Sequence, residues 1–218
     1  MIEKEVKTSV IEYSEQEERA NAVTHGIGFL MALIAFPVLL YKAGPGATEI
    51  GYIGLWVYGL SLLLGMGSST IYHAARDPKR KVLLKKLDHI SIYFLIAGTY
   101  TALILNKMYF QEGLYYLYGL WGMAFLGIFF KALFVHKFKV FSTLIYVLMG
   151  YIMLLDPWMF FRSLSKTADI MLICGGFFYT IGAGFYLWKS KKWTHTIWHI
   201  LVMLGAGSHF AAFLYELS

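Results

Sequence analysis

Three short motifs in otherwise apolar sequence contain residues that can bind a metal ion or support its ligands. They are Ser69-x-x-x-His73, Asp88 next to His89, and His195-x-x-x-His199. Residues four apart on a helix project from one face with Cβ atoms about 5–6 Å apart, so such a pair can bind one ion. Imidazole and carboxylate groups are unfavourable inside a bilayer and usually face a protein interior at a functional site. The motifs therefore predict a bound metal.

The residue types indicate catalytic zinc. Three neutral imidazoles, from His73, His195 and His199, leave a fourth position for water, which is the pattern of catalytic zinc sites. Zinc makes its bound water acidic enough to lose a proton near neutral pH. We expect Asp88 to hold that water or act as general base, with the Ser69 hydroxyl as a hydrogen-bond partner or oxyanion donor. The alternatives are a small packing residue at position 69 and an interfacial carboxylate at position 88.

A second polar motif lies at the start of the first apolar run. Glu18, Asn21, Thr24 and His25 follow one another at short helical spacing, so they can form a network that supports the metal ligands. Helix capping with interfacial anchoring is the alternative, and periodicity does not separate the two. His209 lies ten residues beyond His199, about 15 Å farther along a helix, so we expect it to hydrogen-bond to a neighbouring helix instead.

The elements that position these residues are membrane helices. Hydrophobic residues make up 58% of the 218 residues and charged residues only 15%, against about 25% in soluble domains. The charges separate apolar runs of about 20 residues, the length that spans a bilayer core. The sequence therefore predicts an all-α, seven-helix transmembrane bundle, with spans at Asn21–Lys42, Ile50–Tyr72, Leu87–Leu105, Leu114–Phe130, Val140–Pro157, Ala168–Trp188 and Thr194–Leu217.

Basic residues predict the orientation, because Lys and Arg in short loops stay on the cytoplasmic side. The chain has 19 Lys and Arg residues, and fifteen of them lie on one side of the predicted bundle. The other side has four: Lys42, Lys107, Arg162 and Lys166. We therefore expect a cytoplasmic segment at residues 1–20, with no cleavable signal, and a membrane domain at residues 21–218 with an external C-terminus. All three motifs then lie at the cytoplasmic end. The net charge of +6 marks topology and contact with membrane lipids, not nucleic-acid binding.

In the order and placement of these motifs the chain resembles the progestin and adipoQ receptor family, and its short termini are similar to those of the bacterial haemolysin III branch. The motifs are Glu18-x-x-Asn21-x-x-Thr24-His25, Ser69-x-x-x-His73, Leu87-Asp88 and His195-x-x-x-His199. The resemblance implies a bacterial plasma-membrane protein with seven helices and zinc held by His73, His195 and His199, with Asp88 reaching the zinc-bound water. The wider superfamily includes alkaline ceramidases, so the resemblance also implies hydrolysis of a lipid amide or ester. The chain lacks the receptors' long cytoplasmic domain, so hormone reception is not carried over.

Two classes of function remain open from the sequence. The first is an intramembrane zinc hydrolase with a lipid substrate, favoured by the open ligand position and the adjacent carboxylate. The second is a non-enzymatic membrane sensor or cytolytic pore with a structural zinc. A pore would carry polar residues along the whole length of several helices, whereas the polar residues here cluster at the inner ends. The pattern favours a localised site and leaves the substrate and oligomeric state open.

Overall fold

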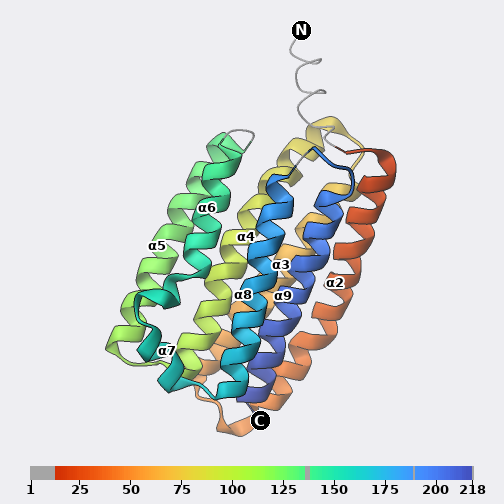
Figure 1. The fold of residues 1–218 in the computed structure, drawn as a ribbon. Helices are drawn as coiled ribbons and strands as arrows, with labels where there is room; N and C mark the ends of the chain where they lie inside the picture. The colour runs from red at the N-terminus through yellow and green to blue at the C-terminus, as the bar shows by residue number, and fades with distance from the viewer. Residues whose placement is uncertain (1–12, 136–137, 189, 218) are drawn as a thin grey trace.

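The protein forms an antiparallel bundle of long helices, seen here in a computed structural model (Figure 1). The structure describes residues 13–135, 138–188 and 190–217. The helices are α2 (Glu15–Ala43), α3 (Glu49–Ala74), α4 (Pro78–Lys107), α5 (Gln111–Phe134), α6 (Lys139–Gly150), α7 (Pro157–Ser163), α8 (Lys166–Leu187) and α9 (Thr194–Glu216), with 3-10 turns η1 (Gly44–Gly46) and η2 (Ile152–Leu155). The expected all-α fold is confirmed.

Six of these helices are long and apolar enough to cross a membrane. The shortest of the six, α8, has 22 residues and is therefore about 33 Å long, slightly more than a bilayer core. Large apolar side chains point outward, including Ile34, Leu126 and Ile170, while serine, histidine and lysine side chains are buried. Apolar side chains outside and polar ones inside are what a lipid surrounding requires.

The run expected at Val140–Pro157 is not one continuous helix. It consists of α6, η2 and the start of α7, and α6 has only 12 residues. The helix ends at Gly150, whose carbonyl accepts a hydrogen bond of 2.6 Å from the Tyr100 hydroxyl. Asp156 then caps α7 by accepting from the Met159 amide, with Pro157 in the first turn. The three pieces descend the bundle together (Figure 1), so the chain remains compatible with seven spans.

Two helices begin earlier than the sequence predicts. Ser14 caps α2 through a capping box with Glu17, so this helix starts at Glu15 inside the expected N-terminal segment. Asp77 caps α4 and Pro78 occupies its first turn, so the basic block before Leu87 is helical. Apolar runs mark the lipid-spanning part of each helix, whereas the caps mark where the helix begins.

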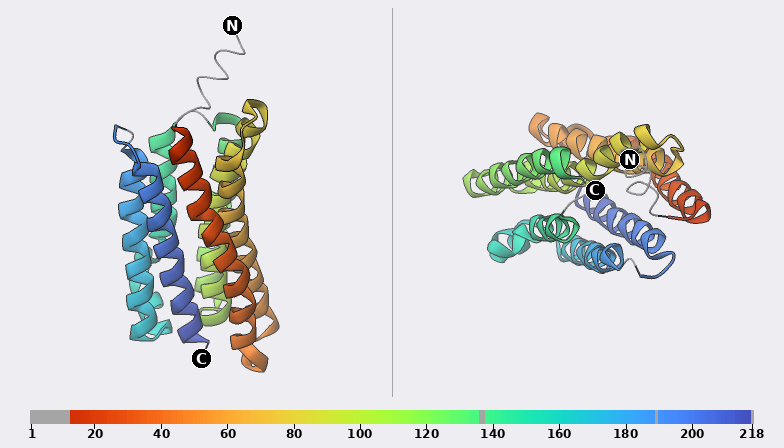
Figure 2. Two further views of the ribbon diagram at one scale, coloured as in Figure 1. Left: turned by 90° about the vertical axis from the view of Figure 1, so that its right-hand side faces the viewer. Right: turned by 90° about the horizontal axis from the view of Figure 1, so that it is seen from above.

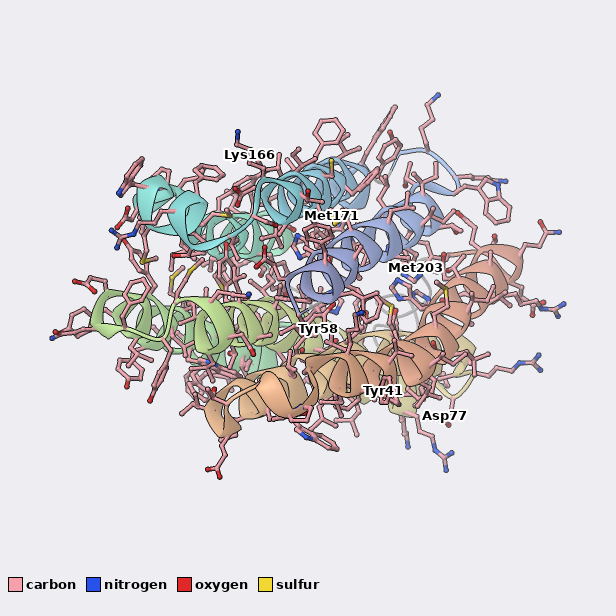
Figure 3. All side chains as sticks on the ribbon, turned by 90° about the horizontal axis from the view of Figure 1, so that it is seen from below. Tyr41, Tyr58, Asp77, Lys166, Met171 and Met203 are labelled. Atoms are coloured by element: carbon pink, nitrogen blue, oxygen red, sulfur yellow. The ribbon has the colours of Figure 1, made fainter. Side chains whose placement is uncertain are left out.

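Helix α4 is the centre of the bundle, since 72% of its most apolar stretch is buried, against 17% to 44% for the other five long helices. It packs against α3 and α5, α8 packs against α9, and α2 contacts both α3 and α9. Figure 2 shows this arrangement from the side and from above. From the opposite end, Tyr58 lies between the helices whereas Lys166 extends from the periphery (Figure 3). The start of α2, the end of α3 and the starts of α4 and α9 thus meet at one end of the bundle.

The orientation in the membrane stays a prediction, and reporter fusions test it. We expect a reporter after Ser218 to face outward and one inserted at residues 75–77, between α3 and α4, to face the cytoplasm, because basic residues gather on that side. Protease accessibility or phosphatase and fluorescent-protein fusions measure each side. If both reporters face the same compartment, the number of spans or the charge argument is wrong.

Candidate metal centre

Three histidines converge at this end of the bundle. His73 lies in the last turn of α3, and His195 and His199 lie in the first two turns of α9. The Nε2 atom of His195 is 3.2 Å from Nε2 of His73 and 3.2 Å from Nε2 of His199. All three side chains are buried. Their nitrogen atoms lie close enough together to hold one metal ion.

The start of α9 is positioned by α2. Trp193, just before the helix, has a left-handed backbone with φ of 67°, and its amide donates a 2.9 Å hydrogen bond to a Glu17 carboxylate oxygen. The same Glu17 side chain accepts from Ser14 at the cap of α2. One carboxylate therefore joins the ends of two helices and sets where His195 enters the bundle.

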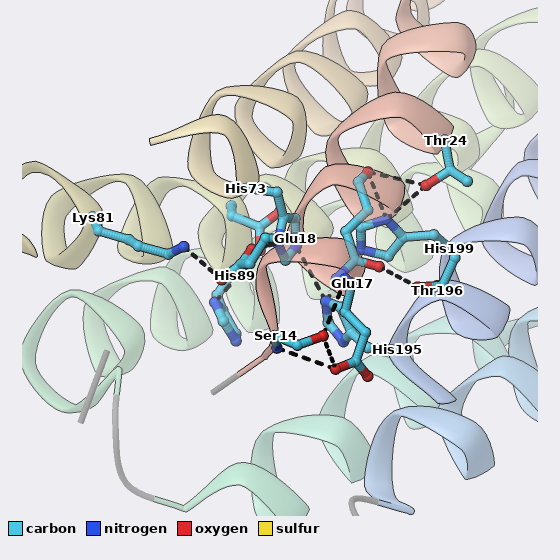
Figure 4. Close-up of polar contacts among 12 residues, drawn as sticks. Ser14, Glu17, Glu18, Thr24, His73, Lys81, His89, His195, Thr196 and His199 are labelled. Carbon is cyan, nitrogen blue, oxygen red and sulfur yellow. Dashed lines mark hydrogen bonds and ion pairs between the residues drawn. The ribbon is translucent and has the colours of Figure 1, made fainter. Parts of the chain in front are cut away.

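The outer nitrogens of two histidines have partners that orient the rings (Figure 4). Nδ1 of His73 is 2.6 Å from a Glu18 carboxylate oxygen, and the other oxygen of Glu18 accepts from Lys81 at 2.5 Å. Nδ1 of His199 is 3.2 Å from the Asn21 carbonyl oxygen and 3.3 Å from the Thr24 hydroxyl. Carboxylate and carbonyl oxygens only accept, so both Nδ1 atoms carry the proton. Both Nε2 lone pairs then point into the centre, as metal ligands require.

The candidate carboxylate and hydroxyl lie beside this cluster. Asp88 is buried in α4, where His73, Ser69 and Lys85 are among its neighbours. Asp88 and His195 both line a cavity of about 50 Å³, enough space for at least one water molecule. Ser69 lies one turn before His73, and its buried Oγ has no hydrogen-bond partner among the described residues. The arrangement can hold a metal ion with a carboxylate and a spare hydroxyl nearby.

The fourth histidine of the predicted network takes a different position. The His25 ring stacks on the His199 ring at 3.6 Å between centroids, with 7° between the planes. Neither His25 nitrogen has a hydrogen-bond partner in the described part of the chain, and the metal-competent group does not include them. The other three residues of that motif, Glu18, Asn21 and Thr24, contact the outer nitrogens of the ligand histidines. His25 thus packs on the ring of His199 and makes no contact with its outer nitrogen that the structure records.

His209 behaves as the sequence predicts. Its Nε2 lies 3.2 Å from the Leu172 carbonyl oxygen, so this side chain joins α9 to α8 well away from the cluster. His89 also lies outside the metal-competent group. Its Nδ1 is 2.7 Å from the Lys85 carbonyl oxygen and its Nε2 is 3.0 Å from the Tyr186 hydroxyl. Both rings connect helices.

Sequence reasoning missed several residues around the centre. The sequence analysis counts three lysines near the centre only as markers of orientation: Lys81, Lys85 and Lys139. In the structure Lys81 pairs with Glu18, and Lys85 and Lys139 line the cavity. Thr196 donates to the Asn21 side-chain oxygen at 2.6 Å. Helical spacing was an available signal for Lys85, which lies three residues before Asp88, but not for Thr196, which directly follows His195 and so points to another side of the helix.

Comparison with known proteins agrees with the motifs. The family described as Haemolysin-III related matches residues 13–210. The chain belongs to this family. It is 36% identical over 203 residues to Hemolysin-3 homolog of Bacillus subtilis, covering 93% of this chain and 95% of that one. It is also 36% identical to Hemolysin-3 of Bacillus cereus over 200 residues, covering 92% and 91% of the two chains.

More distant similarity reaches animal proteins. The chain is 27% identical over 205 residues to human Monocyte to macrophage differentiation factor, covering 90% of this chain and 82% of that one. No solved structure matches. Family membership and the six long apolar helices together identify a multi-pass protein of the cell membrane.

Proposed function

We propose that this protein is a zinc-dependent hydrolase of an amide or ester bond in a membrane lipid. The observation that carries the proposal is the convergence of three imidazole Nε2 atoms beside a cavity that Asp88 also lines. Metal-assisted hydrolysis requires a metal ligand set with an open position, a proton acceptor and space for the reacting group.

The donor set fits zinc. Tetrahedral zinc with nitrogen ligands at 2.0–2.1 Å places those nitrogens about 3.3–3.4 Å apart, close to the two Nε2 separations of 3.2 Å. His73, His195 and His199 would hold the ion through neutral imidazoles, a donor type that zinc favours. When bound, zinc would polarise the scissile carbonyl group and make water more acidic.

The remaining steps belong to the chain's own residues. Asp88, buried on the cavity wall, would accept the proton of the attacking water. Ser69, whose hydroxyl has no hydrogen-bond partner among the described residues, would donate to the developing oxyanion or to Asp88. Glu18 and the Asn21 carbonyl would hold two imidazoles in the required tautomer.

A lipid substrate is supported by an apolar groove between α2 and α9. The groove has a volume of about 400 Å³ and is lined by residues that include Ile27, Met31, Ile200 and Met203. Thr24 lies at the groove and also contacts His199 of the metal centre. An acyl chain in this groove would therefore lie next to the histidine cluster, so we propose that the substrate enters from the membrane.

A structural metal is the second candidate. The three histidines are buried and come from α3 and α9, so an ion between them would tie the end of one helix to the start of the other. Such an ion would serve a non-enzymatic sensor or pore equally well. The role of Asp88 separates the two candidates, because a structural ion needs no proton acceptor.

The test is a lipid-product screen on protein with controlled metal content. Purified protein in lipid nanodiscs is stripped with a chelator, reloaded with zinc, and incubated with ceramides, phospholipids and lysolipids. We expect release of fatty acid from at least one class, lost on stripping and restored by zinc. Mass spectrometry of the extracted lipids measures the product. Full zinc loading without hydrolysis of any lipid would exclude the hydrolase and leave the structural role.

A further inference from the structure

The cavity beside the histidine cluster is strongly cationic. Lys85 of α4, Lys131 of α5 and Lys139 of α6 all line it. Among the lining residues that the structure describes, Asp88 is the one carboxylate. The described lining of the cavity therefore carries three lysine side chains, from three helices, and one carboxylate.

Lys131 is the most unusual of the three lysines. Its side chain is 1% exposed, three residues before the end of α5. Within residues 13–135, 138–188 and 190–217 it makes no hydrogen bond and no ion pair. A buried ammonium group without a partner is strongly unfavourable, and an anion bound in the cavity would supply one.

Snorkelling does not account for Lys131. A lysine near a helix end normally extends its apolar stem along the bilayer and keeps its ammonium group in water. A side chain with 1% exposure stays inside the bundle and lines the cavity instead of extending to the outer surface. Lys79, on the same end of the bundle, is exposed and shows the ordinary arrangement.

Other side chains that line the cavity near Lys131 are held in place by contacts with neighbouring residues. The ammonium group of Lys139 donates to the Tyr186 carbonyl oxygen and lies 3.8 Å above the centre of the Tyr186 ring. The Tyr186 hydroxyl contacts His89, whose other nitrogen contacts the Lys85 carbonyl oxygen. These contacts join α4 and α6, which carry Lys85 and Lys139, to α8, so this part of the cavity lining is preorganised for a ligand.

We propose that this cavity binds a phosphate-bearing anion, with Lys131 as its main ligand and Lys85 and Lys139 beside it. Ammonium groups are hydrogen-bond donors only and bind phosphate oxygens through charge-assisted bonds. The site lies where α4 and α6 begin and α5 ends, the depth at which lipid headgroups carry their phosphates. A volume of about 50 Å³ admits a small charged group. The proposal does not depend on hydrolysis by the metal centre.

Binding of defined probes tests the proposal and identifies the source of the phosphate. Delipidated protein in detergent is titrated with short-chain phosphatidylglycerol, with phosphatidylcholine of the same chain length and with inorganic phosphate, and tryptophan fluorescence reports saturation. We expect Lys131→Met to weaken phosphate binding about tenfold or more, since one charge-assisted bond is lost. Lys79→Met, which removes an exposed charge from the same end, should change affinity less than twofold. Lys131→Arg should retain binding.

Each outcome decides a point. Lys131-dependent binding of phosphatidylglycerol but not of inorganic phosphate assigns a lipid headgroup, and the reverse assigns a soluble anion. Equal binding of phosphatidylcholine and phosphatidylglycerol, or wild-type affinity in Lys131→Met, overturns the proposal. Lys131→Met is nearly isosteric and removes a buried charge, so its thermal stability should match or exceed that of the wild type. Lys85→Met is the second variant if Lys131→Met does not fold.

Discussion

Replacing His199 with alanine is expected to remove the metal and lower stability together. His199 has 0% exposure and belongs to the cluster, with Nε2 3.2 Å from Nε2 of His195 and Nδ1 3.2 Å from the Asn21 carbonyl oxygen. The wild type should contain about one zinc per chain and His199→Ala less than about a tenth. Elemental analysis after purification without added metal measures the content.

The stability effect has its own measurement. An ion held only by the folded state contributes about 2.7 kcal/mol when its free concentration is a hundredfold above Kd. A chelator should therefore lower the Tm of the wild type and leave that of His199→Ala unchanged. His209→Ala is the matched control, because it removes a half-buried histidine from the same helix outside the cluster and should keep the metal. A wild type without metal, not restored by added zinc, would contradict the prediction.

The candidate site was accessible from the sequence because its residues combine polarity with helical spacing. His195 and His199 are four apart, and His73 lies at the matching end of another apolar run, so both the face and the depth could be predicted. The structure brings these three rings together, and family membership is confirmed. The roles of Asp88 and Ser69 stay predictions, since neither position nor burial tests proton transfer.

Other features of the site and fold could not be predicted from the sequence, because they depend on contacts between segments far apart in the chain. His25 has the same spacing as the other polar residues of its motif, yet it stacks on a ring 174 positions away. Lys131 ends an apolar run, where a lysine normally marks topology, and only the packing of α4, α5 and α6 shows its burial. At the break after Gly150, the carbonyl oxygen likewise accepts from the distant Tyr100 hydroxyl. Periodicity describes one helix at a time and carries no information on its partners.

Asp88→Asn is expected to abolish lipid hydrolysis while leaving the metal and the fold in place. Asparagine has nearly the same shape as aspartate but cannot accept a proton at neutral pH, and loss of a general base reduces turnover about 10²- to 10⁴-fold. Asp88 lines the cavity beside His195 and lies outside the metal-competent group, so zinc content should stay near that of the wild type. Turnover of the lipid that the wild type hydrolyses is the measurement.

The matched control is Asp77→Asn, a carboxylate on the same end of the bundle that caps α4 by accepting from the Arg80 amide at 2.8 Å. Asparagine caps helices as well as aspartate does, so this variant should keep both stability and turnover. A general base alters the rate of the chemical step, whereas a residue that only supports a structural ion alters Tm. If Asp88→Asn retains wild-type turnover on every lipid while His199→Ala unfolds, the ion is structural and Asp88 is not catalytic. If Asp88→Asn instead loses the metal and has a lower Tm, Asp88 belongs to the ligand set. The general base is then another residue that lines the cavity.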